Sequence, residues 1–215
     1  MKIAIVPFRN RDAQLRRLLP VLRRHFDQII VVEQARGKPF NRGAVKHAGV
    51  TDTLADDDVI YFHDVDLLPG PDCPCYPDPP DNSVIHLYGH RHCLGGIVGM
   101  RVGTYRHTGG FCLTQWSWGG EDTQLQRDVE ARGFVIDRSH FTQRFSNDSV
   151  VMEMNAQGVS MPGCRARSLF LQQRSEQQRS EQQRSEQQRS DYSLLTFGRH
   201  GPLSSQPKTV HIIVE

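Results

Sequence analysis

The sequence lacks several features that would by themselves assign a class of protein. No apolar run approaches the roughly 20 residues needed to cross a bilayer, and no signal peptide precedes the first apolar segment, so we expect no membrane segment. The 26 basic residues nearly balance the 24 acidic ones, which argues against a nucleic-acid or membrane-surface partner. The five cysteines are odd in number and lack a zinc-type spacing, so we expect them to be unpaired.

Tryptophan is also scarce, and both tryptophans lie in one run, Trp116-Ser-Trp118-Gly-Gly-Glu121-Asp122. Sugars bind proteins by stacking on aromatic rings, while carboxylates accept hydrogen bonds from sugar hydroxyls and can take a proton from one of them. The two glycines would let this segment bend or move as a lid. The run therefore indicates a sugar site; the plainer alternative is a capped helix start with ordinary aromatic packing.

Strands and helices are expected to alternate in the first part of the chain. Apolar spacing predicts a strand over 2–6 ended by Pro7, a helix over 12–26 with Asp12 as N-cap, a strand over 28–33, a helix over 41–50 and a strand over 58–63. This order predicts an α/β fold with a mostly parallel central sheet and helices on both faces. Further strands are expected over 84–88, 96–100 and 134–137, and a helix over 121–132.

A low-complexity tract divides the rest of the chain. The unit Gln-Gln-Arg-Ser-Glu repeats from residue 172 to about 190, and it has no apolar face that could join a core. We therefore predict a catalytic core over 1–165, a repeat insert over 166–190 and a C-terminal segment over 191–215. The apolar end of that segment, 209–215, could rejoin the sheet as a strand.

The pair Asp64-Val65-Asp66 follows a predicted buried strand. Because side chains alternate along a strand, both carboxylates would share one face and could hold one cation. Hard oxygen ligands suit Mg²⁺ or Mn²⁺, which in turn neutralise a diphosphate. The alternative is that two acidic residues merely end a strand.

Two polar motifs follow strands that the pattern makes parallel. Open α/β sheets bind ligands outside the carboxyl ends of their strands, so the run 7–11 and the pair Asp64 and Asp66 should meet at one crevice. A proline turn followed by two arginines can hold the base of a nucleotide with its backbone and a phosphate with its arginine side chains. Phe40-Asn41-Arg42 could pack a ring there. The alternatives are a polar loop that starts a helix and a simple helix entry capped by Asn41.

These motifs resemble the β-1,4-galactosyltransferase family, glycosyltransferase family seven. The likeness rests on Pro7-Phe-Arg-Asn-Arg11, Phe40-Asn-Arg42, Asp64-Val-Asp66-Leu-Leu-Pro69, Gly95-Gly96 and Trp116-x-Trp118-Gly-Gly-Glu121-Asp122, and it covers about residues 2–138. The resemblance implies a GT-A (Rossmann-like) fold, a UDP-sugar donor and Mn²⁺. It also implies inverting transfer that forms a β1-4 bond to the terminal sugar of an acceptor glycan, such as GlcNAc, glucose or xylose.

The resemblance also assigns roles to residues. The uridine-diphosphate pocket would comprise Pro7, Phe8, Arg9, Arg11 and Phe40. On the donor side, Asp64 and Gly96 would contact the sugar nucleotide, and Asp66 would bind the metal. On the acceptor side, Trp118 would lie on the lid, Glu121 would hold hydroxyls, and Asp122 would be the base that deprotonates the acceptor.

Two departures from the family pattern affect the predicted chemistry. The family supplies further metal ligands from a Met-x-x-His motif, but the stretch 141–148 lacks it, so His140 or Asp148 would have to substitute. In addition, Cys93 replaces a bulkier residue that crowds the C2 position of the donor in galactose-transferring members. The smaller side chain leaves room for an N-acetyl group, so UDP-GalNAc joins UDP-galactose as a candidate donor.

Other readings stay open at this level. A catalytically degenerate sugar-nucleotide or glycan-binding module is favoured by the missing Met-x-x-His and opposed by the intact Glu121-Asp122. A chondroitin-type transferase is a third option. The family is normally anchored in the Golgi by an N-terminal helix, so the chain would be cytoplasmic if complete and in the Golgi lumen if it is a fragment of an anchored enzyme.

Overall fold

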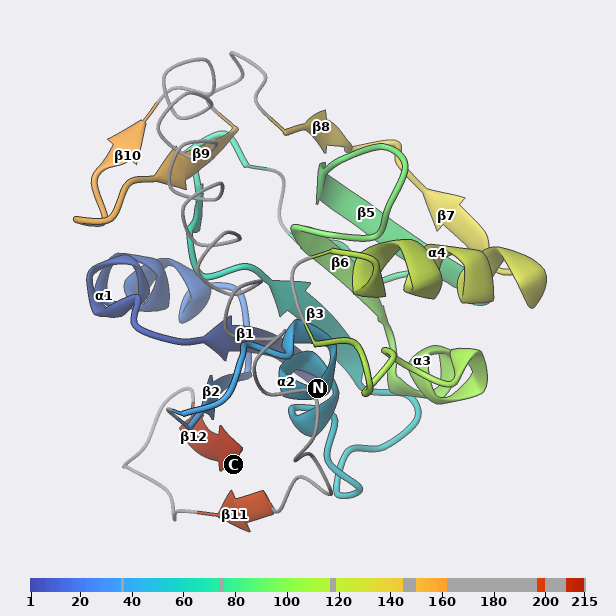
Figure 1. Ribbon diagram of the computed structural model, residues 1–215. Coiled ribbons are helices and arrows are strands. Elements are labelled where there is room, and N and C mark those ends of the chain that lie inside the picture. Colours follow the sequence, from blue (N-terminus) through green and yellow to red (C-terminus); the bar gives the residue numbers. More distant parts are fainter. Residues whose placement is uncertain are drawn as a thin grey trace.

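The computed structural model describes residues 1–35, 37–73, 76–116, 119–144, 150–161, 197–199 and 208–214 (Figure 1). The repeat tract, Trp118 and Asp148 lie outside these residues. The central sheet contains β1 (Lys2–Phe8), β2 (Gln28–Gln34), β3 (Val59–His63), β5 (Ser83–Gly89), β6 (Ile97–Arg101), β7 (Val135–Asp137), β8 (Thr142–Gln143), β11 (Phe197–Arg199) and β12 (Lys208–Val214). A smaller sheet contains β4 (Leu67–Pro69), β9 (Val151–Met154) and β10 (Ser160–Met161).

The central sheet is mixed, with a parallel part that carries the predicted crevice. Its order is β11-β12-β2-β1-β3-β6-β5-β7, and β8 pairs with β5. Strands β12, β2, β1 and β3 run parallel to one another, whereas β6 runs antiparallel to both β3 and β5. The predicted α/β fold is therefore confirmed.

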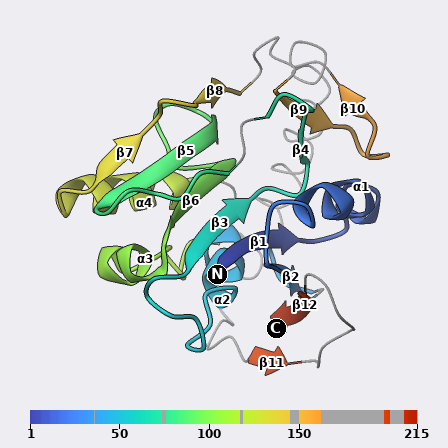
Figure 2. The same cartoon turned by 180° about the vertical axis from the view of Figure 1, so that it is seen from behind.

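Helices cover both faces of the sheet, as predicted (Figures 1 and 2). The helices are α1 (Asp12–Leu22), α2 (Arg42–Ala48), α3 (Val102–Thr108) and α4 (Glu121–Ala131). Side chains alternate along β1, so Ala4 packs with Leu18 of α1 on one face, and Ile5 packs in the cluster of Val45 from α2 on the other. The helices α3 and α4 contribute to the same cluster as α2.

Several element boundaries differ from the expectation, and those of β1 and α1 have a clear physical reason. Strand β1 continues through Pro7, because β3 pairs only as far as Ile5 and proline is tolerated where a strand has a neighbour on one side. Helix α1 ends at Leu22. Its N-cap is Arg11 and not Asp12, and Arg11 makes no side-chain capping hydrogen bond. Phe26 matches the helical spacing but reaches the core from beyond the helix, where it packs against the rings of Tyr61 and Tyr76.

The C-terminal strand β12 pairs in parallel with β2 over the full length of both strands. Its side chains Ile212 and Val214 are buried in the cluster that contains α2. The division of the chain into three regions stays a prediction.

Of the described cysteines, Cys93 and Cys112 are free thiols, as expected. In the described ranges, no helix combines the length and apolar character required to span a membrane.

Candidate active site

The acidic pair lies at the edge where β1 and β3 end. These strands are parallel neighbours, so their carboxyl ends meet as predicted. Asp64 and Asp66 do not share a strand face, however, because β3 ends at His63 and both aspartates lie in the turn before β4. The backbone N–H of Leu67 closes that turn by donating to the carbonyl of Asp64 at 3.2 Å, and the N–H of Asp64 donates to the carbonyl of Gly96 at 3.0 Å in the register of the β3–β6 pairing. Both carboxylates are buried, at 5% and 9% residue exposure.

Two predicted nucleotide-pocket residues come together at this edge. The guanidinium of Arg9 lies 5.3 Å from the centre of the Phe40 ring and donates to the carbonyl of Lys38 at 2.9 Å. Phe40 and Arg9 are both half-buried. Pro7 and Phe8 are buried at the end of β1, and Arg11 is half-buried at the start of α1.

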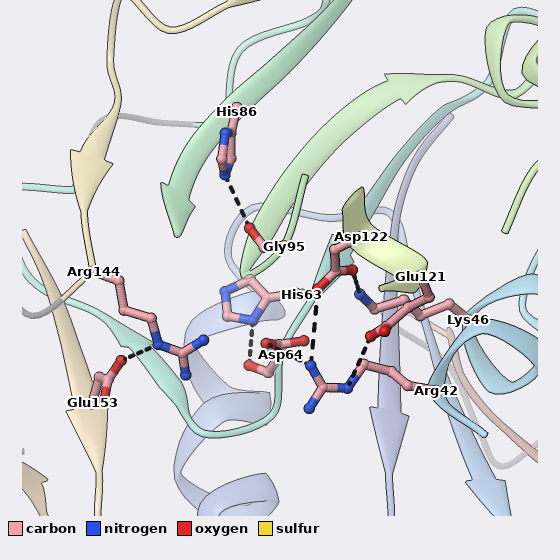
Figure 3. Close-up of polar contacts among 10 residues, drawn as sticks. All are labelled: Arg42, Lys46, His63, Asp64, His86, Gly95, Glu121, Asp122, Arg144 and Glu153. Atoms are coloured by element: carbon pink, nitrogen blue, oxygen red, sulfur yellow. Dashed lines mark hydrogen bonds and ion pairs between the residues drawn. The ribbon is translucent and has the colours of Figure 1, made fainter. Parts of the chain in front are cut away.

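Three carboxylates and two cations converge beside the acidic turn (Figure 3). Lys46 donates to Oδ1 of Asp122 at 2.7 Å. Arg42 lies 3.6 Å from Oε1 of Glu121 and 4.0 Å from both Asp64 Oδ2 and Asp122 Oδ2. The two cations come from α2, and two of the carboxylates come from the first turn of α4.

Local structure explains why these side chains meet. Asn41 caps α2 by accepting a hydrogen bond from the N–H of Ala44 at 2.9 Å, and its amide donates to the carbonyl of Leu113 at 2.6 Å. Residues four apart on a helix share a face, so Arg42 and Lys46 project together. The positive end of the α4 dipole favours the two carboxylates in its first turn.

Burial shapes the protonation of this cluster. The pKa of Glu121 is raised, first by burial and then by the charge of Asp122, and the two cations offset this only in part. Neither carboxylate oxygen of Glu121 has a hydrogen-bond partner among the described residues. For Lys46, burial opposes the charged form, but the carboxylates outweigh it, Asp122 above all, and the pKa is raised.

The glycine pair before β6 allows a close approach to Asp122. A Cβ atom on Gly95 would lie 2.5 Å from Oδ2 of Asp122, and one on Gly96, where φ is +80°, would lie 2.3 Å from the carbonyl of Tyr88. The N–H of Leu94 donates to the carbonyl of Asp122 at 3.1 Å. The loop between β5 and β6 therefore forms a wall of the site against the start of α4.

The predicted metal ligands are not brought together as expected. His140 is exposed in the turn between β7 and β8. Within the part of the chain that the structure describes, no group of three or more His, Cys, Asp or Glu side chains could hold a metal ion. The stretch expected to supply the further ligands instead places Arg144 against Glu153, with Nε and Oε1 2.7 Å apart. In Figure 3 this pair lies on the opposite side of Asp64 from Arg42.

A divalent cation nevertheless fits the donor type and charge of the acidic turn. Asp64 and Asp66 offer hard carboxylate oxygens. With Glu121 and Asp122 they make four carboxylates, faced by the two cations of α2, while Arg144 and Glu153 balance each other. The surplus of two negative charges is what a divalent cation would neutralise.

Sequence reasoning missed three contributors to the site. Arg42 belongs to the Phe40-Asn41-Arg42 motif, which by itself indicates no role for the guanidinium, whereas the position of Lys46 four residues after Arg42 is a usable signal. His63 is buried, and its Nδ1 lies 3.0 Å from the carbonyl of Asp64. Burial lowers the pKa of His63 to about 4, so its ring is neutral at pH 7.

The order of the central sheet and the acidic turn after β3 define a GT-A type domain. Two family models match the chain: the N-terminal region of glycosyl transferase group 7 over residues 1–77, and the N-terminal domain of galactosyltransferase over residues 85–148. The chain belongs to glycosyltransferase family seven.

Similar proteins support this assignment. The chain is 35% identical over 156 residues to β-1,4-galactosyltransferase 5 of Danio rerio, covering 65% of this chain and 41% of that protein. It is 32% identical over 178 residues to β-1,4-galactosyltransferase 4 of Homo sapiens, covering 73% and 52%. The chain thus spans about half or less of the length of these curated relatives.

Solved structures share the fold. The catalytic domain of Drosophila β-1,4-galactosyltransferase 7 in complex with xylobiose superimposes with a TM-score of 0.70 at 20% identity, covering 99% of this chain and 93% of that one. A mutant of the same Drosophila enzyme, complexed with manganese, UDP-Gal and xylobiose, gives a TM-score of 0.69 at 18% identity, with the same coverage.

Proposed function

We propose that this chain is an inverting glycosyltransferase that moves galactose, or GalNAc, from a UDP-sugar to a hydroxyl of an acceptor glycan and forms a β1-4 linkage. The observation that carries the proposal is the ion cluster around Asp122, which lies at the start of α4 beside the acidic turn that follows β3. It supplies a proton acceptor next to a site for a charged donor, in a chain that belongs to family seven.

Each side chain then has a task. Arg9 and Phe40 would hold the uridine diphosphate, and Asp64 would contact the donor. Asp122 would take the proton from the acceptor hydroxyl. At the same time, the oxygen of that hydroxyl would attack the anomeric carbon of the donor sugar from the side opposite the departing diphosphate. One base and in-line attack invert the configuration in a single step.

Asp66, with Asp64, would hold a Mn²⁺ ion. When bound, the ion neutralises charge on the leaving diphosphate. Trp118 stays a predicted lid residue, and His140 stays a prediction as a metal ligand that the described geometry does not support.

The first test measures UDP release from UDP-galactose with glycosides of GlcNAc, glucose and xylose, with and without Mn²⁺. We expect release that depends on both acceptor and metal. UDP binding without acceptor-dependent release would instead indicate the non-catalytic binding module, which the intact ion cluster around Asp122 disfavours.

Donor choice is a second prediction. Cys93 is half-buried in the loop between β5 and β6, and burial, followed by the charge of Asp122, raises the pKa of its thiol. Because this small side chain stands close to the base, we expect UDP-GalNAc to be turned over at a rate similar to UDP-galactose. Cys93→Tyr should lower kcat/KM for UDP-GalNAc at least tenfold relative to UDP-galactose, since a hydrophobic clash of a few atoms is worth about 1–3 kcal/mol. Strict use of galactose by the wild type would refute the prediction.

A further inference from the structure

Lys46 is a buried cation that the proposed reaction has not used. Its residue exposure is 1%, although lysine is rarely buried without a partner. Its ammonium lies 2.7 Å from Oδ1 of Asp122 and 4.8 Å from the centre of the Phe111 ring. The Phe111 ring and the Asp122 carboxylate together fix the position of the Lys46 ammonium.

The two oxygens of Asp122 therefore have different surroundings. Oδ1 accepts the hydrogen bond of Lys46. Oδ2 lies beside Gly95, in the space that a Cβ atom at that residue would fill, and 4.0 Å from Arg42. A carboxylate held at one oxygen cannot rotate about its last bond without losing that hydrogen bond. We infer that Lys46 is a positioning residue that holds Asp122 by Oδ1 and leaves Oδ2 as the atom that receives the proton of the acceptor hydroxyl. This inference rests on the proposed function.

Stability alone does not account for a lysine at this place. A buried ion pair loses much of its Coulombic attraction to the cost of removing both charges from water, and apolar residues of similar size often replace such pairs without loss of stability. A general base, in contrast, must hold its oxygen in line with the proton it takes, and a misplacement of 1 Å can cost about 100-fold in rate. The close pair therefore serves the orientation of Asp122.

The test compares Lys46→Met with Lys2→Met. Lys2 forms an ion pair of similar length, 2.8 Å to Asp78, at the opposite end of β1. We expect Lys46→Met to lower kcat about tenfold, which is less than the loss of about 100-fold that a misplacement of 1 Å can cause. The Kd of UDP, measured by calorimetry, should stay unchanged. Lys2→Met should keep the wild-type kcat and Kd.

The outcomes separate the inference from the proposed function. If the wild type transfers sugar from none of the donors, the proposed function is wrong. Transfer by the wild type with an unchanged kcat in Lys46→Met overturns the inference, and so does a loss of UDP affinity that matches the loss of kcat. If Lys46→Met does not fold, Lys46→Arg takes its place, because arginine keeps the charge but presents its donors at a different point. A lowered kcat with unchanged UDP affinity then supports the inference, and a wild-type kcat overturns it.

Discussion

Replacing Asp122 with Asn is expected to lower kcat by about 10²- to 10⁴-fold, the range that a general base contributes. An amide cannot accept the proton of the acceptor hydroxyl at neutral pH. Its size matches the carboxylate, so its oxygen can still accept the hydrogen bond of Lys46 and leave the nucleotide pocket around Arg9 and Phe40 undisturbed. The Kd of UDP, measured by calorimetry, should therefore stay within about twofold of the wild type, well under the 1.4 kcal/mol that a tenfold change represents.

Asp128→Asn is the matched control for this variant. Asp128 lies on the same helix, less than two turns further along, and accepts a hydrogen bond from Gln124 at 3.1 Å. It has no contact with the ion cluster, so its substitution should leave kcat unchanged. Near-normal turnover in Asp122→Asn would remove Asp122 as the base, and an equal loss in both variants would point to the stability of α4 instead.

Glu121→Gln is expected to raise stability while it lowers turnover. Glu121 is 2% exposed, and its two oxygens lack hydrogen-bond partners among the described residues. Removing a buried charge whose cost Arg42 and Lys46 offset only in part should raise the free energy of unfolding by on the order of 1 kcal/mol at pH 7. Loss of a charged acceptor for the sugar hydroxyls should lower kcat/KM by about 10- to 100-fold, since hydrogen bonds to charged groups contribute about 1.5–3 kcal/mol. Denaturant unfolding and steady-state kinetics measure the two effects.

The stability gain should depend on pH in a defined direction. The pKa of Glu121 is raised above its ordinary value of 4.5, so the folded protein binds this proton more tightly than the unfolded chain. The cost of the buried charge is fully present above the raised pKa and disappears as the pH falls through it. The advantage of Gln over Glu is thus largest at neutral pH and shrinks toward acid. Glu130→Gln, at an exposed position on α4, should show no such trend. A variant that is less stable than the wild type at pH 7 would contradict the account.

Sequence patterns predicted the parallel part of the fold well. The buried runs of β1, β2 and β3 have no polar alternation, and they are separated by segments with helical spacing. The meeting of the chain after β1 and the chain after β3 followed from parallel pairing alone. The free thiols of Cys93 and Cys112 followed from the number and spacing of the cysteines.

Other features could not be read from local pattern. Phe26 fits the spacing of α1, but it reaches the core from outside the helix because the rings of Tyr61 and Tyr76 receive it there. Asp64 and Asp66 resemble the end of a strand, yet β3 ends at His63 and both aspartates lie in a turn whose first residue, Asp64, is bonded through its N–H to the carbonyl of Gly96. Such contacts join residues distant in sequence, which periodicity does not record.

By itself, the sequence determined the family motifs, the alternation of strands and helices, and the identity of the acidic residues, because these depend on residue type and spacing along the chain. Only the tertiary structure decided which cations face those acids. Lys46 resembles any solvated lysine of a helix until α2 packs against the start of α4, where burial removes water and leaves Asp122 as its partner. The charge environment of a site is a property of distances through space, and those are set when the layers pack.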